Sequence, residues 1–380
     1  MQETTSLNTD KIYDKYENKG YILDMSKLKD GDIILEHGYS KISPIIEGVT
    51  NCYYTHAMIY LEETIIEATG DGGVFSRVPN RFYVPYREDL KVLRLTSAIP
   101  SYCMDQITLR ARDLVGSCYD ITQAALAGLN PAQKKKLLKK ANKYQFCSRL
   151  VAQCYDRGGV KLVDSIDYCS PRDIFDAKDY LEEIKDAVKE ASPAEIFHAK
   201  SGEVHPHHLK CCVTWVRESK KILKKSGYDV QTINEIVSAV IHSKNKKIDD
   251  LICTKIIESG YLTNFLDDKT VNPYRYSSEL FSEKIEQADG DVNDKLDGEI
   301  WKEKSIVNLH CKNFITTKNM YNEHPVKILK LHLELHENIL SIIKERLIII
   351  LSYCRENNMQ PNNLRYAAHL YTKIEETIGK

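Results

Sequence analysis

A cysteine, a histidine and a glutamate in the first half of the chain have the side chains needed for thiol hydrolysis. His56 lies in an apolar run that predicts a β-strand, and Glu67 lies in the next such run. Cys147 follows 91 positions after His56. In a Cys–His–acid group the imidazole accepts the thiol proton and later protonates the leaving group, while the carboxylate orients the imidazole. Spacing alone does not bring the three residues together.

Cys147 stands where an amphipathic helix is predicted to begin, near Gln145. Cys147, Leu150, Val151 and Cys154 recur at helical spacing, and the Gly158-Gly159 pair provides a C-terminal stop. Unpaired backbone amides and the helix dipole favour a negative charge at such an N-terminus. The Cys147 thiol is therefore expected to ionise below the free value of about 8.5.

His56 and Glu67 are expected on the two strands of a β-hairpin whose turn is Glu62-Glu63. A two-residue loop makes them diagonal neighbours on one face, close enough for the side chains to meet. A three-residue loop would place the carboxylate among apolar residues on the other face, at considerable cost. The two-residue register is favoured. The opposite face then carries the apolar residues Ala57, Ile59, Leu61, Ile66 and Ala68.

The elements that position these residues belong to a mixed first half, which a helical second half follows. Short apolar runs bounded by turn residues predict strands and a few helices up to about residue 175, an α+β pattern. Beyond it, apolar residues recur at three and four positions, which predicts helices. We expect two domains, residues 1–180 and 181–380, with a charged helix over 177–190 and an exposed acidic loop near 287–298.

The composition excludes several classes of protein. Hydrophobic residues make up 42% and charged residues 28% of the 380 residues, as in ordinary globular proteins, which excludes wholly disordered and collagen-like chains. Fifty-three basic and 54 acidic residues leave a net charge of −1. No overall field therefore attracts a nucleic acid.

Six segments resemble, in order, the YiiX-like branch of the circularly permuted papain-like (NlpC-type) cysteine hydrolases. They are residues 29–35, 40–50, 54–60, 65–74, 115–120 and 146–155. The similarity covers about residues 28–175 and does not extend into 185–380. It implies a permuted papain-like domain with an antiparallel sheet and packed helices, in which the histidine strand precedes the cysteine helix.

The resemblance also implies roles for individual residues. Cys147 would be the nucleophile, His56 the base and Glu67 the orienting acid, and Tyr119 would be a cleft or oxyanion contact. Arg149 departs from the family, which usually has an acidic residue at this position. This departure does not affect the nucleophile, but it means that the substrate preference of the family does not carry over to this chain.

The sequence therefore predicts a cysteine hydrolase that attacks an amide, isopeptide, ester or thioester carbonyl through a covalent acyl-enzyme, without a cofactor or metal. Its substrate would be a protein, a peptide or a lipid acyl group. One alternative is a lipid acyl hydrolase or acyltransferase at a membrane surface, and another is an inactive scaffold whose helical domain binds a protein partner. A basic run could contact such a membrane, although a solvated helix face is the simpler interpretation. It comprises Lys134, Lys135, Lys136, Lys139, Lys140 and Lys143.

Two groups of histidines are interpreted as structural. The first, His205, His207 and His208 with Cys211 and Cys212, suggests zinc, but the irregular spacing fits no standard ligand pattern. The second, His332 and His336, lacks the glutamate that a metalloprotease carries after the first histidine. No metal site is therefore expected.

We expect a cytosolic location. Eleven cysteines without the regular spacing of a disulfide scaffold favour free thiols in a reducing compartment. No signal peptide and no membrane-spanning helix are expected. The Lys-, Asn- and Ile-rich composition, with a helical module joined to the first domain, is similar to that of secreted effectors of intracellular bacteria, which would place the protein in a host cytosol.

Overall fold

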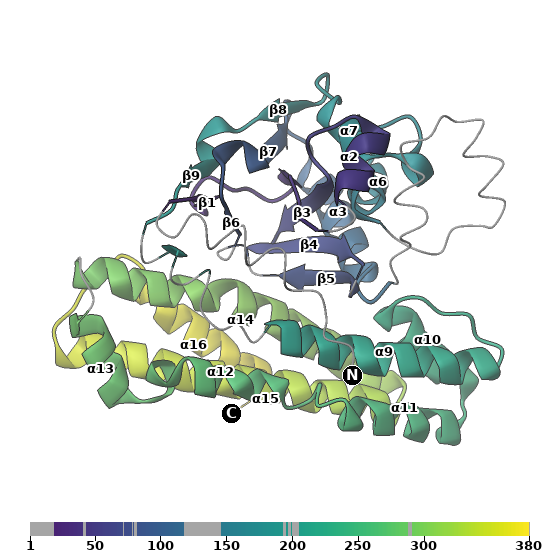
Figure 1. Ribbon diagram of the computed structural model, residues 1–380. Coiled ribbons are helices and arrows are strands. Elements are labelled where there is room, and N and C mark those ends of the chain that lie inside the picture. The colour runs from purple at the N-terminus through teal and green to yellow at the C-terminus, as the bar shows by residue number, and fades with distance from the viewer. Residues whose placement is uncertain are drawn as a thin grey trace, which may run out of the picture. The chain divides into compact units, whose positions relative to one another are not determined.

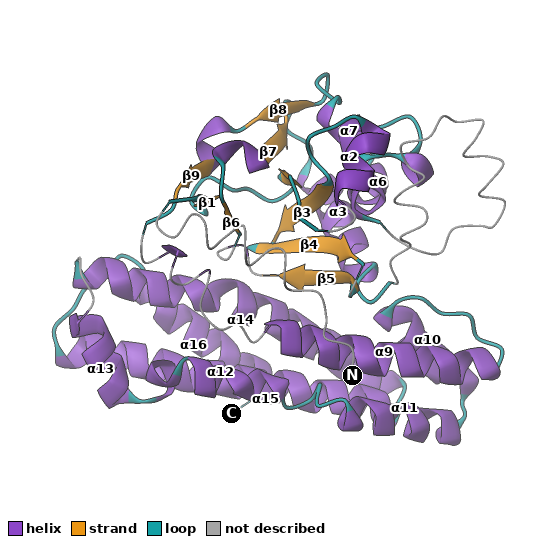
Figure 2. Cartoon of the chain, viewed as in Figure 1, coloured by secondary structure: helices purple, strands orange, loops and turns teal. Residues whose placement is uncertain are grey.

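The computed structural model describes the chain in several stretches (Figure 1). They are residues 19–40, 43–70, 72–77, 79, 82–117, 146–192, 195–196, 199, 205–287 and 291–379. The chain divides into two compact units, the first of residues 1–201 with 231–233 and the second of residues 202–230 and 234–380. The first contains antiparallel sheets and helices and the second is helical, so the fold is α+β followed by a helical region (Figure 2).

Antiparallel strands make up two sheets in the first unit. They are β1 (Tyr21–Leu23), β2 (Ile33–Glu36), β3 (His56–Leu61), β4 (Thr64–Thr69), β5 (Gly73–Arg77), β6 (Tyr83–Val84), β7 (Leu90–Leu95), β8 (Leu181–Glu183) and β9 (Val188–Glu190). One sheet has six strands in the order β5-β4-β3-β2-β7-β8, and the other has three in the order β6-β1-β9. Within the described residues, the α-helices of this unit are α2 (Ser43–Thr50), α3 (Ser101–Asp113), α6 (Cys147–Arg157) and α7 (Pro171–Phe175).

Both faces of the six-stranded sheet are buried. The predicted apolar face of the β3–β4 hairpin is confirmed, because its five residues join a core to which α6 contributes Leu150 and Val151. The other face carries Met58, Tyr60 and Ile65, which join a second core with residues of β1, β6 and β9. The hairpin is thus held from both sides, and this rigidity benefits any site built at its end.

The β3–β4 hairpin has the two-residue turn predicted from the sequence. Leu61 pairs with Thr64, and the preceding residues pair in the same register. Glu62 and Glu63 both have positive φ, 49° and 60°, as the two central residues of a type I′ turn require. The register therefore follows from the turn, and it sets which side chains of the two strands share a face.

The charged helix expected over 177–190 is wrong, because this segment contains two strands. β8 pairs with β7 and β9 pairs with β1, each at the end of its sheet. Leu181 and Val188 are buried while Glu182 and Glu190 are exposed, so the charges that suggested a solvated helix lie on edge strands. The first unit consequently extends past residue 180.

Eight α-helices in the described residues belong to the second part of the chain. They are α9 (His205–Lys225), α10 (Ile233–Ser243), α11 (Lys246–Glu258), α12 (Asp267–Val271), α13 (Ser278–Gln287), α14 (Val292–Glu323), α15 (Lys327–Glu356) and α16 (Leu364–Ile378). The acidic loop expected over 287–298 is shorter than predicted. Asp291 caps α14 by accepting hydrogen bonds from two backbone amides, so the helix already begins at Val292. Within the described residues no helix is long and apolar enough to cross a bilayer.

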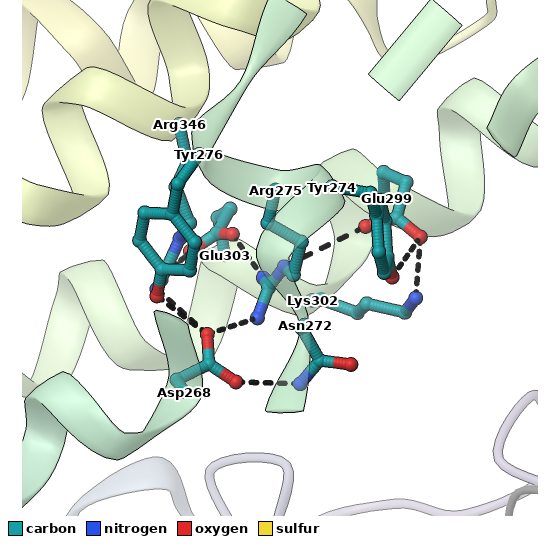
Figure 3. A network of polar contacts seen from close by, with 9 residues as sticks. All are labelled: Asp268, Asn272, Tyr274, Arg275, Tyr276, Glu299, Lys302, Glu303 and Arg346. Atoms are coloured by element: carbon teal, nitrogen blue, oxygen red, sulfur yellow. Dashed lines mark hydrogen bonds and ion pairs between the residues drawn. The ribbon is translucent and has the colours of Figure 1, made fainter. Parts of the chain in front are cut away.

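A network of paired charges joins the short segment around α12 to the long helices of the second unit (Figure 3). Arg275 bonds Glu303 and lies 3.2 Å from Asp268, while Arg346 from α15 bonds the other oxygen of Glu303. The Glu303 side chain is only 1% exposed. Removal of one member would leave a buried charge unpaired, so the network fixes how these helices pack.

Candidate active site

Cys147 and His56 each stand at the beginning of a secondary-structure element. Cys147 is the first residue of α6, so the helix begins two residues after the predicted Gln145 and Cys147 lies in its first turn, as expected. Phe146 before it has an extended backbone with φ −142° and ψ 165°. His56 is the first residue of β3. Because α6 and β3 share one hydrophobic core, the start of the helix is held beside the start of the strand.

The structure brings the three predicted residues into contact. His56 Nε2 lies 2.8 Å from Glu67 Oε2, and the side chains of His56 and Glu67 are 17% and 3% exposed. The imidazole of His56 and the thiol of Cys147 are close enough for a hydrogen bond between them to shift the pKa of both groups. A carboxylate only accepts hydrogen bonds, so Nε2 carries the hydrogen and Nδ1 is left for the thiol.

The electrostatics of the pair favour a proton on the imidazole. Desolvation opposes a charge on His56, but hydrogen bonds to Cys147 and Glu67 outweigh it and raise the pKa of His56 well above its ordinary value. Desolvation likewise opposes a charge on Cys147, which for a thiol means a higher pKa. The hydrogen bond and charge of His56 outweigh this effect and lower the pKa of Cys147, and the backbone amides of Ala57 and Ser148 lower it further. Both shifts favour a thiolate–imidazolium pair.

Two charged residues that the sequence analysis missed also surround the pair. Arg77 Nη1 lies 3.6 Å from Glu67 Oε1, and its guanidinium lies over the Phe82 ring, 4.2 Å from the ring centroid. Glu36 is the direct partner of His56 across β2 and β3, and burial raises the pKa of Glu36. The positive charge of Arg77 favours the ionised form of Glu67.

Arg149 lies on α6 two residues after Cys147. Its side chain is buried, and Nη2 lies 2.7 Å from Asp167 Oδ1. Asp167 belongs to the wall of a polar cleft of about 520 Å³. The other wall residues are Arg110, Asp113, Gln153, Asp156, Arg157 and Ile166. The basic side chain two residues after Cys147 therefore pairs with this wall.

The structure does not describe every residue that the sequence singles out. Tyr119 and the run Lys134, Lys135, Lys136, Lys139, Lys140 and Lys143 lie outside the described residues. Among the remaining thiols of the first unit, burial raises the pKa of Cys154 to about 12 and also raises those of Cys52 and Cys169. In the stretches that the structure describes, no group of three or more His, Cys, Asp or Glu side chains is placed to hold a metal ion.

Comparison with known proteins gives distant similarity to solved structures. No protein-family profile matches the chain, and no curated protein matches its sequence. The crystal structure of metalloprotein yiiX from Escherichia coli O157:H7 is similar over 44% of this chain and 99% of its own, with 16% identity and a TM-score of 0.32.

Proposed function

We propose that this protein is a cysteine hydrolase with a permuted papain-like first unit. Cys147 is the nucleophile, His56 the base and Glu67 the acid that orients the imidazole. The observation that carries the proposal is the continuous contact from Glu67 through His56 to Cys147, in which the first step measures 2.8 Å. This is the arrangement by which an acid holds a histidine in the tautomer that accepts a thiol proton.

The proposed reaction begins with attack of the Cys147 thiolate on the carbonyl carbon of an amide, isopeptide, ester or thioester. Backbone amides in the first turn of α6 lack partners within the helix and would stabilise the negative oxygen that develops. The His56 imidazolium then protonates the leaving group, which leaves an acyl group on Cys147. Water, deprotonated by the same imidazole, releases the acid and restores the thiol.

Glu67 acts in this cycle as a carboxylate, the form that the charges of His56 and Arg77 favour. Its side chain is 3% exposed, which by itself would favour protonation, but both His56 and Arg77 offset its burial. A charged Glu67 stabilises the imidazolium in both halves of the cycle. The acyl substrate would come from a protein, a peptide or a lipid, and the helical unit would bind a protein partner.

The test is covalent labelling of the full chain with electrophilic acyl probes, one based on a peptide and one on a fatty acid, followed by peptide mapping. Label is expected on Cys147, and it should be lost in Cys147→Ala and strongly reduced in His56→Ala. Cys154→Ala is the matched control, because Cys154 lies on the same helix with a pKa raised to about 12. Labelling that persists in Cys147→Ala would refute the proposed nucleophile, and the preferred probe would identify the substrate class.

A further inference from the structure

A second group of a cysteine, a histidine and a carboxylate lies in the helical unit. His207 and Cys211 are four residues apart on α9, so they share a helix face, and Cys211 Sγ lies 3.5 Å from His207 Nε2. On the other side of the ring, His207 Nδ1 lies 2.6 Å from Oδ2 of Asp267, the first residue of α12. Asp267 is distant in sequence, so the tertiary fold brings the acid to this histidine.

The carboxylate determines which nitrogen can take a proton from the thiol. Asp267 accepts a hydrogen bond, so Nδ1 of His207 carries the hydrogen and Nε2 presents a lone pair to Cys211. The order of atoms is therefore thiol, imidazole and carboxylate, as in the first unit. His208, the next residue, bonds a different acceptor: its Nε2 lies 2.6 Å from the carbonyl oxygen of Asn264 and 3.9 Å from Asp267 Oδ2.

Cys211 and its neighbour Cys212 differ in their surroundings. The residue Cys211 is 4% exposed, close to the 3% of Cys147, while Cys212 is more exposed. Nevertheless, desolvation raises the pKa of the Cys212 thiol to about 12. Adjacent helix positions point about 100° apart, so the histidine that faces Cys211 does not serve Cys212. Solvent exposure thus favours reaction at Cys212, whereas proton transfer to His207 favours reaction at Cys211.

The backbone beside Cys211 favours thiol exchange over acyl transfer. A Cβ added to Gly260 would lie 3.6 Å from Cys211 Sγ, so the turn at Gly260 borders the thiol. The Gly260 amide already donates to the carbonyl of Ile257, so it is not offered to an oxyanion. Disulfide exchange needs only a thiolate and a proton for the leaving thiol.

We propose that Cys211 is a second reactive thiol, which exchanges with small disulfides with the help of His207 and Asp267. His207 Nε2 takes the thiol proton, and the Cys211 thiolate attacks one sulfur of the disulfide. A new S–S bond forms to Cys211 while the original one breaks, and the departing thiolate takes the proton back from His207. The small disulfide is the only oxidant, and the product is a mixed disulfide on Cys211.

The experiment treats the reduced full-length protein with glutathione disulfide at neutral pH and follows each cysteine by peptide mapping over time. Cys211 should form the mixed disulfide about tenfold or more faster than Cys212. His207→Gln and Asp267→Asn should each slow Cys211 severalfold and leave Cys212 unchanged. His242→Gln, on α10, is the matched control, because its ring bonds Ser238 of its own helix, and it should leave both rates unchanged. The same rates are expected in Cys147→Ala, so the outcome is independent of the proposed hydrolase.

Several outcomes would overturn the proposal. One is a Cys211 rate no higher than that of Cys212. Another is an unchanged Cys211 rate in His207→Gln. If that variant fails to fold, Asp267→Asn decides, because an unchanged Cys211 rate in that variant excludes help from the His207–Asp267 pair. Saturable protection of Cys211 by Zn²⁺, lost in the His207 and Asp267 variants, would instead identify a metal site.

Discussion

Replacement of Glu67 by glutamine tests the proposed orienting acid most directly. The amide keeps the size of the side chain, which matters because Glu67 is only 3% exposed. It removes the charge that faces the imidazolium and introduces a donor that favours neutral imidazole. We therefore expect Glu67→Gln to fold normally and to weaken the thiolate–imidazolium pair.

The expected size of the effect follows from the 2.8 Å contact between Glu67 and His56. A hydrogen bond to a charged group contributes about 1.5–3 kcal/mol and a neutral one about 0.5–1.5 kcal/mol. The loss of about 1–1.5 kcal/mol corresponds to about one pKa unit. The Cys147 pKa is lowered and the His56 pKa is raised, so the thiolate–imidazolium pair exists in the pH range between the two values. Glu67→Gln should raise the lower pKa and reduce the higher one, which narrows this pH range from both ends.

The assay is the rate of Cys147 alkylation by iodoacetamide as a function of pH, measured by mass spectrometry. On the acidic limb, where the rate follows the thiolate fraction, Glu67→Gln should react about tenfold more slowly, with the limb displaced about one unit upward. At high pH, where Cys147 is fully ionised in both proteins, the alkylation rate should change little. An unfolded variant would instead differ from wild type at every pH. Glu63→Gln, in the turn of the same hairpin, is the matched control. Identical pH profiles for Glu67→Gln and wild type would refute the assignment.

Three further predictions concern charge, domain structure and pH. Arg77→Met should move the acidic limb in the same direction as Glu67→Gln but by less, because Nη1 is 3.6 Å from the carboxylate and the Arg77 side chain is 28% exposed. A fragment of the first 201 residues should unfold cooperatively on heating, followed by circular dichroism, whereas one of the first 180 should be less stable because it lacks β8 and β9. Burial lowers the pKa of His336 to about 3 from 6.5, so this group destabilises the fold as pH falls below 6.5. Between pH 7 and pH 5.5, His336 should lower the unfolding free energy of the wild type by about 1 kcal/mol. Denaturant titrations at the two pH values should show a fall in unfolding free energy that is smaller by this amount in His336→Leu.

The hairpin shows how much of the candidate site could be predicted from sequence. The alternation of apolar residues and the two-residue turn are local features, and together they determine which side chains share a face. His56 and Glu67 meet because of that register. The start of α6 at Cys147 is local as well, since it follows from helical spacing and a glycine stop.

The charged surroundings of the pair could not be predicted in this way. Glu36 faces His56 only because β2 pairs with β3, and Arg77 reaches Glu67 only because β5 pairs with β4. Pairing between strands depends on how the whole sheet assembles. The same cause explains why the sequence predicts a helix where β8 and β9 lie. Their charged side chains are compatible with a solvated helix, and only the pairing with the edge of a sheet makes them strands.

The two Cys–His–acid groups of the chain differ mainly in how far water enters them. His56 and Glu67 are 17% and 3% exposed, whereas His207 and Asp267 are 59% and 38% exposed. Attraction between charges weakens with solvent access, so the acid contributes less to imidazolium stability at the second group. Cys211 also lies away from a helix start, whereas Cys147 is the first residue of α6. Both differences favour Cys147 over Cys211. Because His207 faces Cys211 and not Cys212, we expect the reactivity of the thiols to fall in the order Cys147, Cys211, Cys212. Exposure alone would favour Cys212 over Cys211, so the order of alkylation separates activation by neighbouring groups from simple access.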